Sequence, residues 1–292
     1  MGRMERKGIC KLNGKTLYLH TITPLHSGTG QTVAVIDLPV AREKATGYPV
    51  IPASSLKGVL RDAAGGKSDA ANRLFGSLEK AGAISIGDQR LLCLPVRSYF
   101  GTFAYISCPL ALGRFVRDLE ALGLNAPFKK ADVPVVDDTT TGLAVVLPNA
   151  PISSLKHGAQ VFLEDLDLAI QEAAGAAAIA EGLAEILFNG EETMFTTRFG
   201  LVSDNVFSYL CETALEVSAR VALHDETKTV RTGGLWYEEA VPAEAIFAGP
   251  VLIESRFEGT AEEAFAAVNR KLIQVGGKSS VGRGLCRMIV GE

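Results

Sequence analysis

The chain has 292 residues, of which 47% are hydrophobic and 21% charged, and 29 Lys and Arg against 33 Asp and Glu give a formal net charge of −4. This length suits one or two domains, and the apolar fraction excludes a wholly disordered chain. The acidic balance excludes a uniformly basic surface but not a local basic patch. We find no transmembrane span and no secretory signal, and five cysteines without a CxxC motif favour a reduced, cytoplasmic protein.

Charge is distributed unevenly along the chain. Residues 161–197 contain eight acids and no Lys or Arg, whereas residues 270–287 contain five bases and no acid. Residues 42–73 contain six bases against three acids. If the two basic segments meet in the fold, they form a face that attracts phosphate; if they do not, they are two solvated surfaces.

The first part of the chain alternates strand-like and helical patterns. Residues 15–23 alternate and predict a strand, and residues 32–36 predict a shorter one. Ser54 and Ser55 offer an N-cap for a helix that carries Leu56, Val59 and Leu60 on one face and Lys57 and Arg61 on another. Further along, the patterns predict strands over 84–86, 91–96 and 103–107 and a helix over 109–122.

The second part begins with a Pro-rich excursion at 125–160, followed by an Ala-rich helix over 166–188 and a short helix over 204–213. Two strands at 216–223 and 235–239 are joined by a mobile hairpin tip at 224–234. A strand over 246–256, a helix over 260–274 and a strand over 285–290 complete the chain. This order fits an α+β, ferredoxin-like fold, in which helices cover one face of an antiparallel sheet.

Two loop residues are candidates for chemistry. Asp37 follows an apolar run and precedes Leu38 and Pro39, where a carboxylate can hold a hydrated divalent cation such as Mg²⁺ or Mn²⁺, or orient a nucleophile. An Asp ahead of a Pro is also a common turn residue. His26 can act as an acid or base, or be a polar surface group.

Two further features suit phosphate. The helix that opens at Ser54 and Ser55 presents free backbone N–H groups beside two bases. The segment 276–284 (GGKSSVGRG) has four glycines that allow close approach to a sugar–phosphate chain, or it is a simple Gly-rich turn. Its GKS ending resembles a Walker A loop, but Leu272 stands where the first glycine is required, which excludes a P-loop NTPase.

Four segments carry a resemblance to a known family: LHTITPLHSGTGQ, VIDLPVAREKATGYPVIPASSLKGVLR, TKTVRTGGLWYEEAVP and IQVGGKSSVGRG. They resemble the backbone subunit of type III-B CRISPR (Cmr) effector complexes, of the RAMP superfamily, and the likeness runs from about Leu17 to Gly284. It implies a single RAMP domain over 1–292: a modified RRM/ferredoxin-like palm, an insertion at about 125–200 and a β-hairpin thumb at about 216–245.

The resemblance also implies partners and a reaction. Copies would stack into a helical filament along a CRISPR guide RNA, together with other Cmr subunits, and each thumb would kink the duplex of guide and target RNA. Metal-dependent cleavage of the target RNA at regular intervals would follow, with specificity supplied by base pairing. A purely structural guide-binding subunit is the alternative, and a guide-processing endoribonuclease is a more distant one; the presence of Asp37 favours cleavage of the target.

The family's site residues fall on named positions of this chain. Asp37 matches the catalytic, metal-binding aspartate, His26 a histidine of the same loop, and Glu238 and Glu239 an acidic pair near the thumb base. The RNA-binding residues that the patterns and the resemblance together indicate are Arg42, Lys44, Ser54, Ser55, Lys57, Arg61, Lys228, Gly276, Gly277, Lys278 and Arg283.

Overall fold

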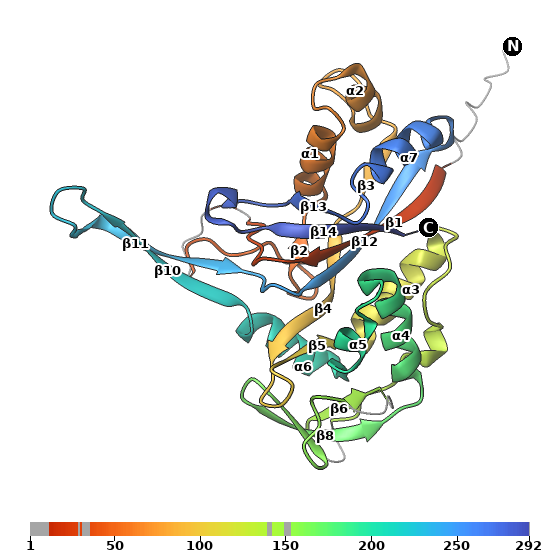
Figure 1. Cartoon of the computed structure of the whole chain (residues 1–292), viewed down its shortest axis with the longest axis vertical. Coiled ribbons are helices and arrows are strands. Elements are labelled where there is room, and N and C mark those ends of the chain that lie inside the picture. Colours follow the sequence, from red (N-terminus) through yellow and green to blue (C-terminus); the bar gives the residue numbers. More distant parts are fainter. Residues whose placement is uncertain (1–11, 29, 31–35, 139–141, 149–152, 292) are drawn as a thin grey trace, which may run out of the picture.

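The computed structural model describes residues 12–28, 30, 36–138, 142–148 and 153–291 (Figure 1). Among them a twelve-stranded mixed sheet runs through the molecule, with β2 (Val50–Ile51) beside β4 and β3 (Ile84–Ile86) beside β12. Its other strands are, in spatial order, β13 (Lys271–Gln274), β14 (Leu285–Gly291), β1 (Leu12–Thr21), β12 (Ile246–Glu254), β4 (Gln89–Arg97), β5 (Phe103–Ser107), β9 (Phe199–Val202), β6 (Ala144–Leu147), β8 (Leu166–Glu172) and β7 (Gln160–Leu163).

In the run β14, β1, β12 and β4, each strand is antiparallel to its neighbour. Between β1 and β4 the chain passes through α1 (Ala53–Ala63) and α2 (Asp69–Phe75), and between β12 and β14 through α7 (Glu258–Ala266). Parallel pairing occurs further along the sheet, between β5 and β9 and between β6 and β8. The expectation of an antiparallel sheet therefore holds for this part of the sheet, while the sheet as a whole is mixed.

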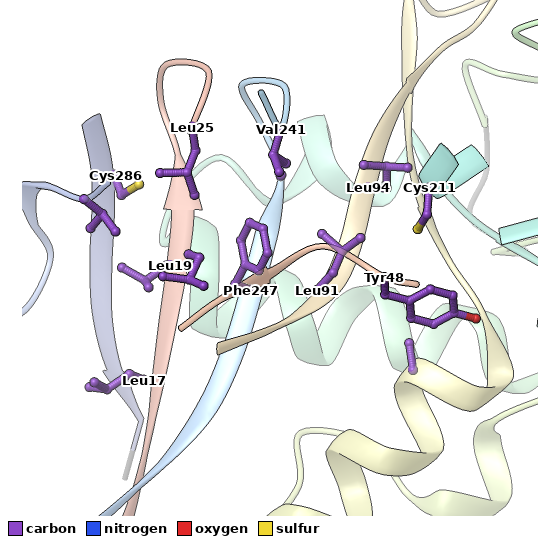
Figure 2. Close-up of a cluster of buried hydrophobic side chains, with 14 of the residues drawn as sticks. Leu17, Leu19, Leu25, Tyr48, Leu91, Leu94, Cys211, Val241, Phe247 and Cys286 are labelled. Carbon is purple, nitrogen blue, oxygen red and sulfur yellow. The ribbon is translucent and has the colours of Figure 1, made fainter. Parts of the chain in front are cut away.

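Helices cover both faces of the sheet, and not one face as the sequence predicted (Figure 1). Along β1, Leu17 and Leu19 pack in one core with α1 and α7, whereas Tyr18 packs in a second core with α3 (Pro109–Ala121) and α4 (Gly175–Phe188). Figure 2 shows Leu19 beside Phe247 of β12 in the first core, with Leu17 further along β1. Because successive residues of a strand point to opposite faces, β1 needs large apolar side chains in consecutive positions.

Two predicted helices are shorter than expected because their ends form strands. Residues 166–172 belong to β8, whose backbone pairs with β6 on one side and β7 on the other. Residues 271–274 belong to β13, which pairs with β14. The Ala-rich pattern of 166–188 and the apolar face of 260–274 predict helices over both segments, and strand partners elsewhere in the chain override that local preference.

The predictions at 84–86, 103–107 and 204–213 are confirmed residue for residue, the last as α6 (Asp204–Thr213). The Pro-rich segment contains the short strand β6, β7 starts at its last residue, and α5 (Glu192–Thr196) precedes β9. The predicted strand at 32–36 lies, except for residue 36, outside the described residues. In the part of the chain that the structure describes, no helix combines the length and the apolar character needed to cross a bilayer.

The hairpin is a sheet of its own. β10 (Glu216–Leu223) and β11 (Val230–Ala240) pair only with each other in the named sheets, and they project away from the main sheet (Figure 1). β11 starts at Val230, so the tip spans 224–229 and is shorter than the predicted 224–234. The base of the hairpin, at the end of β11, is where the candidate site lies.

Candidate functional site

Four segments that are distant in sequence meet at the base of the hairpin: the loop after β1, the segment 36–43, the end of β11, and the Gly-rich loop 276–284. Leu25 exchanges two backbone hydrogen bonds with Val241, at 2.8 and 2.9 Å. The backbone N–H of Gly277 donates to the carbonyl of His26 at 2.9 Å. This bond joins the Gly-rich loop, which belongs to the basic segment 270–287, to the loop after β1, which lies outside the other basic segment, 42–73.

His26 is buried between these segments, with 8% of its surface exposed. Its Nδ1 lies 2.7 Å from the carbonyl oxygen of Glu239, and because a carbonyl only accepts, Nδ1 carries the proton. The other ring nitrogen, Nε2, faces Gly28: a Cβ added at that glycine would lie 2.7 Å from Nε2. The ring therefore ties the loop after β1 to the end of β11.

Gly276 is required for this arrangement. Its φ is +75°, in the left-handed region, and a Cβ at this position would lie 2.4 Å from the carbonyl oxygen of His26. The glycines of this loop, predicted to approach a phosphate chain, thus bring the loop close to the protein's own backbone. Whether Gly276 and Gly277 also contact RNA stays a prediction.

Asp37 lies half-buried beside the hairpin, at the start of a short segment that runs parallel to β11. Its Oδ2 accepts a hydrogen bond of 2.8 Å from the backbone N–H of Tyr237. Leu38 then donates to the carbonyl of Tyr237 and accepts from the N–H of Glu239. Among the described residues, Tyr237 supplies the hydrogen bond that the Asp37 carboxylate accepts. The other carboxylate oxygen, Oδ1, accepts none from them and is available to a ligand.

Glu238 is 2% exposed, and its carboxylate is surrounded by donors. Lys278 Nζ and Trp236 Nε1 each lie 2.8 Å from Oε1, and Arg220 Nε lies 3.3 Å from Oε2. Burial alone raises the pKa of Glu238, but the hydrogen bonds and charge of Lys278, with those of Trp236 and Arg220, outweigh it and lower the pKa to about 2. The group is a fixed anion and not a proton acceptor at neutral pH.

Glu239 faces the other side of β11 and is equally enclosed, with 3% of its surface exposed. Its Oε2 accepts from the N–H of Val40 at 2.9 Å, and its Oε1 from Arg42 at 2.7 Å. Arg42 also donates to the carbonyls of Gly47 and Cys211. These contacts give Arg42, predicted to bind RNA, a set of partners within the protein.

The two bases of the Gly-rich loop point inward. Lys278 pairs with Glu238, and Arg283, 8% exposed, donates from Nη2 to Ser218 Oγ of β10 at 3.2 Å. The sequence predicted that both would bind the guide backbone. The structure places them against the two strands of the hairpin: Lys278 is paired with the buried Glu238, whereas Arg283 Nη1 is buried without a hydrogen-bond partner among the described residues. Whether either base also contacts RNA stays a prediction. Arg220, which completes this cluster, was missed, because only the register of the hairpin places it opposite Trp236.

The predicted phosphate site at the start of α1 needs a correction. The N-cap is Pro52 and not Ser54 or Ser55, and Asp88 Oδ1 accepts from the backbone N–H of Ala53 at 2.8 Å. A carboxylate of the protein therefore already engages the first N–H group of the helix. Whether Ser54 and Ser55 contact RNA stays a prediction. Ser54 lies exposed on the first turn, and Ser55 is half-buried.

The remaining predicted bases lie apart from the cluster at the hairpin base. Arg61 donates to the carbonyl of Gly66 and to Asn72, so it links α1 to α2. Lys57 borders a small hollow formed with residues 75–82. Lys44 and Lys228 are exposed, the latter at the hairpin tip with a φ of +54°.

The site does not contain a ready-made metal cage. The described residues include no group of three or more His, Cys, Asp or Glu side chains arranged to hold a metal ion. Glu238 and Glu239 do not fit as ligands, because cations and N–H groups of the protein already engage their oxygens. Asp37 fits as a single ligand, which suits Mg²⁺, since this ion is commonly held by one or two carboxylates together with substrate phosphates.

Comparison with known proteins identifies the family. A model described as the RAMP superfamily matches residues 18–287. The chain belongs to the RAMP superfamily. Within it, the chain is 34% identical over 289 residues to the CRISPR system Cmr endoribonuclease Cmr4 of Pyrococcus furiosus, a match that covers 94% of each chain. It is 22% identical to the CRISPR system CMR subunit Cmr4 of Saccharolobus solfataricus.

Solved structures agree with this placement. The crystal structure of oligomeric Cmr4 from Pyrococcus furiosus matches with a TM-score of 0.75 and 28% identity, covering 97% of this chain and 99% of that one. A type III-B Cmr-beta complex bound to cognate target RNA contains a chain with the same TM-score of 0.75 at 22% identity, a likeness of fold. The resemblance that the sequence motifs indicated is confirmed.

Proposed function

We propose that this chain is the backbone subunit of a type III-B Cmr complex and that, in the assembled complex, it cleaves target RNA paired with a guide RNA at regular intervals. The observation that carries the proposal is the 34% identity, over 94% of both chains, to a protein named as the Cmr endoribonuclease. The position of Asp37 at the base of a projecting hairpin supports it, because one oxygen of the carboxylate is oriented by Tyr237 while the side chain stays half-exposed.

The architecture supports a ferredoxin-like palm with a thumb. Four strands of the sheet lie side by side in the order β14, β1, β12, β4. Numbered by their order along the chain, these are the fourth, first, third and second strands, and α1 and α7 lie in the two crossover connections. The β10–β11 hairpin is the thumb of this single RAMP domain. Residues from about 125 to 200 extend the sheet beyond β5 and form the insertion.

The proposed reaction is attack by the 2′-OH of the target on the adjacent phosphate. It needs the 2′-OH, the phosphorus and the leaving oxygen in line, a geometry that a nucleotide displaced by the thumb can adopt. Asp37 is the catalytic residue: it would hold a divalent ion, Mg²⁺ or Mn²⁺, against the RNA. When bound, such an ion stabilises negative charge that develops on phosphate oxygens. The product would carry a cyclic phosphate.

The other three candidates act as positioning residues in this proposal. His26 is assigned this role because its Nδ1 is held by the carbonyl of Glu239 and its Nε2 lies against Gly28. Glu238 and Glu239 are assigned it because both carboxylates are enclosed and paired. Lys44, Lys57 and Lys228 are the predicted bases left for contact with guide or target RNA.

The proposed partners are the two RNAs, further copies of this chain in a helical filament, and other Cmr subunits. One face of the hairpin supports contact with a partner, because its large side chains are apolar and 41 to 53% exposed; we call it the apolar hairpin face, and it consists of Val217, Val221, Leu223, Val230, Leu235 and Tyr237. The cross-strand pairs Val221–Leu235 and Leu223–Val230 place these side chains on the same side.

The decisive test is Asp37→Asn in the reconstituted complex with guide RNA, complementary target RNA and Mg²⁺ or Mn²⁺. We expect loss of a carboxylate ligand to slow target cleavage by about 10²-fold or more while guide and target binding persist, because electrostatic stabilisation of a transition state is commonly worth that much. Single-turnover cleavage on gels and filter binding measure the two quantities. A 2′-deoxy nucleotide at the cut position should block cleavage in the wild type.

Asp167→Asn is the matched control: it removes one carboxylate from an exposed position on β8, and it should cut at the wild-type rate. Wild-type cleavage by Asp37→Asn would overturn the assignment of Asp37. Absence of cleavage by the wild-type complex itself would favour the purely structural subunit instead.

A further inference from the structure

We infer that Glu238 and Lys278 form a positioning pair that sets the angle at which the hairpin leaves the main sheet, and through it the placement of Asp37. Neither residue contacts RNA in this role. The inference deepens the proposed function, on which its cleavage readout rests, and it changes the role that the sequence predicted for both residues.

The hairpin depends on its base for its orientation. It forms a two-stranded sheet separate from the twelve-stranded one, and an isolated two-stranded hairpin is at best marginally stable in water. Between Trp236 and the tip most residues of the hairpin are exposed, whereas Glu238, Glu239 and Ala240, at its base, are buried. The contacts that hold the hairpin therefore lie at its base, at Ser218 and Arg220 of β10 and at residues 236–240 of β11.

Glu238 joins three segments within this base. Arg220 reaches it from β10, Trp236 from β11 and Lys278 from the Gly-rich loop. Lys278 is the one of these donors that comes from outside the hairpin, so its bond to Glu238 fixes the hairpin relative to the loop. Removing Lys278 leaves Arg220 as the remaining cation on a carboxylate that is 2% exposed, and a buried carboxylate is destabilised more by losing a cation than a surface carboxylate is.

The loop that carries Lys278 is itself anchored. Lys278 has a φ of +68°, and the preceding Gly277 donates to the carbonyl of His26. His26 in turn donates to the carbonyl of Glu239. A second hydrogen bond joins Arg283 of the same loop to Ser218 of β10, so both strands of the hairpin contact this one loop.

The same stretch of β11 orients Asp37. Tyr237, the residue before Glu238, donates its N–H to the Asp37 carboxylate, and Leu38 pairs with Glu238 in a parallel bridge. A shift of β11 at Glu238 therefore moves the hydrogen-bond donor of Asp37. Since small displacements of a reacting group reduce rates strongly, the pair controls cleavage without touching the reacting atoms.

The first arm of the test uses the assembled complex with Lys278→Ala. We expect target cleavage to slow by about tenfold or more through misplacement of Asp37, while the affinity for guide RNA and its dependence on salt stay at wild-type values. Lys278→Arg should restore most of the rate, because it keeps the cation. Lys271→Ala, an exposed lysine of the neighbouring β13, is the matched control and should leave both quantities unchanged.

The second arm uses the full-length chain alone and does not depend on cleavage. Trp236 is the only tryptophan of the sequence, and its indole N–H donates to Glu238, so its fluorescence reports the ionisation of that carboxylate. The wild type should show flat Trp236 emission from pH 7 to 4, because the pKa of Glu238 is held at about 2. Lys278→Ala should raise that pKa and bring a transition into this range, with circular dichroism to verify that the fold persists.

The outcomes separate the two proposals. Flat Trp236 emission in Lys278→Ala together with a wild-type rate of cleavage overturns the positioning pair. Flat emission together with weaker guide binding and a shallower salt dependence also overturns it, because that result identifies Lys278 as a phosphate contact. A wild-type complex that does not cleave refutes the proposed function, and a shifted Trp236 transition in the isolated Lys278→Ala chain would still support the pair.

Discussion

At the scale of single residues, the Gly-rich loop contains two glycines with different constraints. Gly276 and Gly282 both have a φ near +75°, but a Cβ would meet the carbonyl of His26 at Gly276 and nothing within 4 Å at Gly282. Gly282→Ala should therefore cost about 1 kcal/mol for the left-handed backbone alone. Gly276→Ala adds a displacement of the loop, and we expect it to cost about 1–3 kcal/mol more.

Urea unfolding of the full chain, followed by circular dichroism, measures both changes. Equal free energies of unfolding for the two variants would show that the approach of Gly276 to His26 does not contribute to stability. Because Gly282 lies in the same loop and also has a positive φ, Gly282→Ala is a control for the conformational part of the effect.

The sequence identified most of the residues at the site but not their partners. The sequence motifs indicated His26, Asp37, Glu238, Glu239 and the Gly-rich loop as candidate site residues, and the structure brings them together at the base of the hairpin. Their roles could not be predicted, because Glu238 meets Lys278 across 40 positions and Asp37 meets Tyr237 across 200. Nothing local to a lysine indicates that its counterion will be a buried glutamate of the protein instead of a phosphate.

At the scale of elements, the hairpin carries apolar surface that the chain itself leaves exposed. Replacing Val221 and Leu235 together by Thr should change the free energy of unfolding by less than about 0.5 kcal/mol, since both side chains are already more than half exposed. If the apolar hairpin face contacts another copy or the RNA duplex, the same variant should form fewer multi-copy complexes on guide RNA.

Mass photometry of mixtures of the chain with guide RNA measures the number of copies bound. Leu78→Thr and Val135→Thr are suitable controls, because both residues are large, apolar and strongly exposed outside the hairpin. Unchanged assembly of the hairpin variant would contradict a role of this face in the complex.

Elements with a clear local signal were predicted well, and those defined by distant partners were not. Residues 204–213 form a helix whose N-cap Ser203 accepts from Val206, a signal contained in the sequence. Residues 166–172 and 271–274 are strands because β6, β7 and β14 lie beside them. Their apolar patterns fit either a helix or a strand, and only the fold decides between the two.

At the scale of the whole molecule, the two cores share one sheet. Leu60 of α1 belongs to the first core and Leu183 of α4 to the second, and both side chains are buried. Truncating either to Ala should lower the free energy of unfolding by about 2–5 kcal/mol. Because β1 and β12 contribute side chains to both cores, each variant should still unfold in a single transition.

Near-ultraviolet and far-ultraviolet circular dichroism of each variant test this expectation during urea unfolding. Coincident curves indicate that the insertion and the rest of the sheet unfold together. Two separated transitions in Leu183→Ala would instead show that the part containing α4 unfolds independently.

The division of the hairpin into a fixed base and an exposed far half has a consequence for how the protein can vary. The side chains that hold the hairpin by hydrogen bonds belong to Ser218, Arg220, Trp236, Glu238 and Glu239, and all of them lie away from the tip at 224–229. Adding or removing two residues on each strand near the tip preserves which face every side chain occupies. The depth to which the hairpin reaches can therefore evolve, or be engineered, independently of the chemistry at its root.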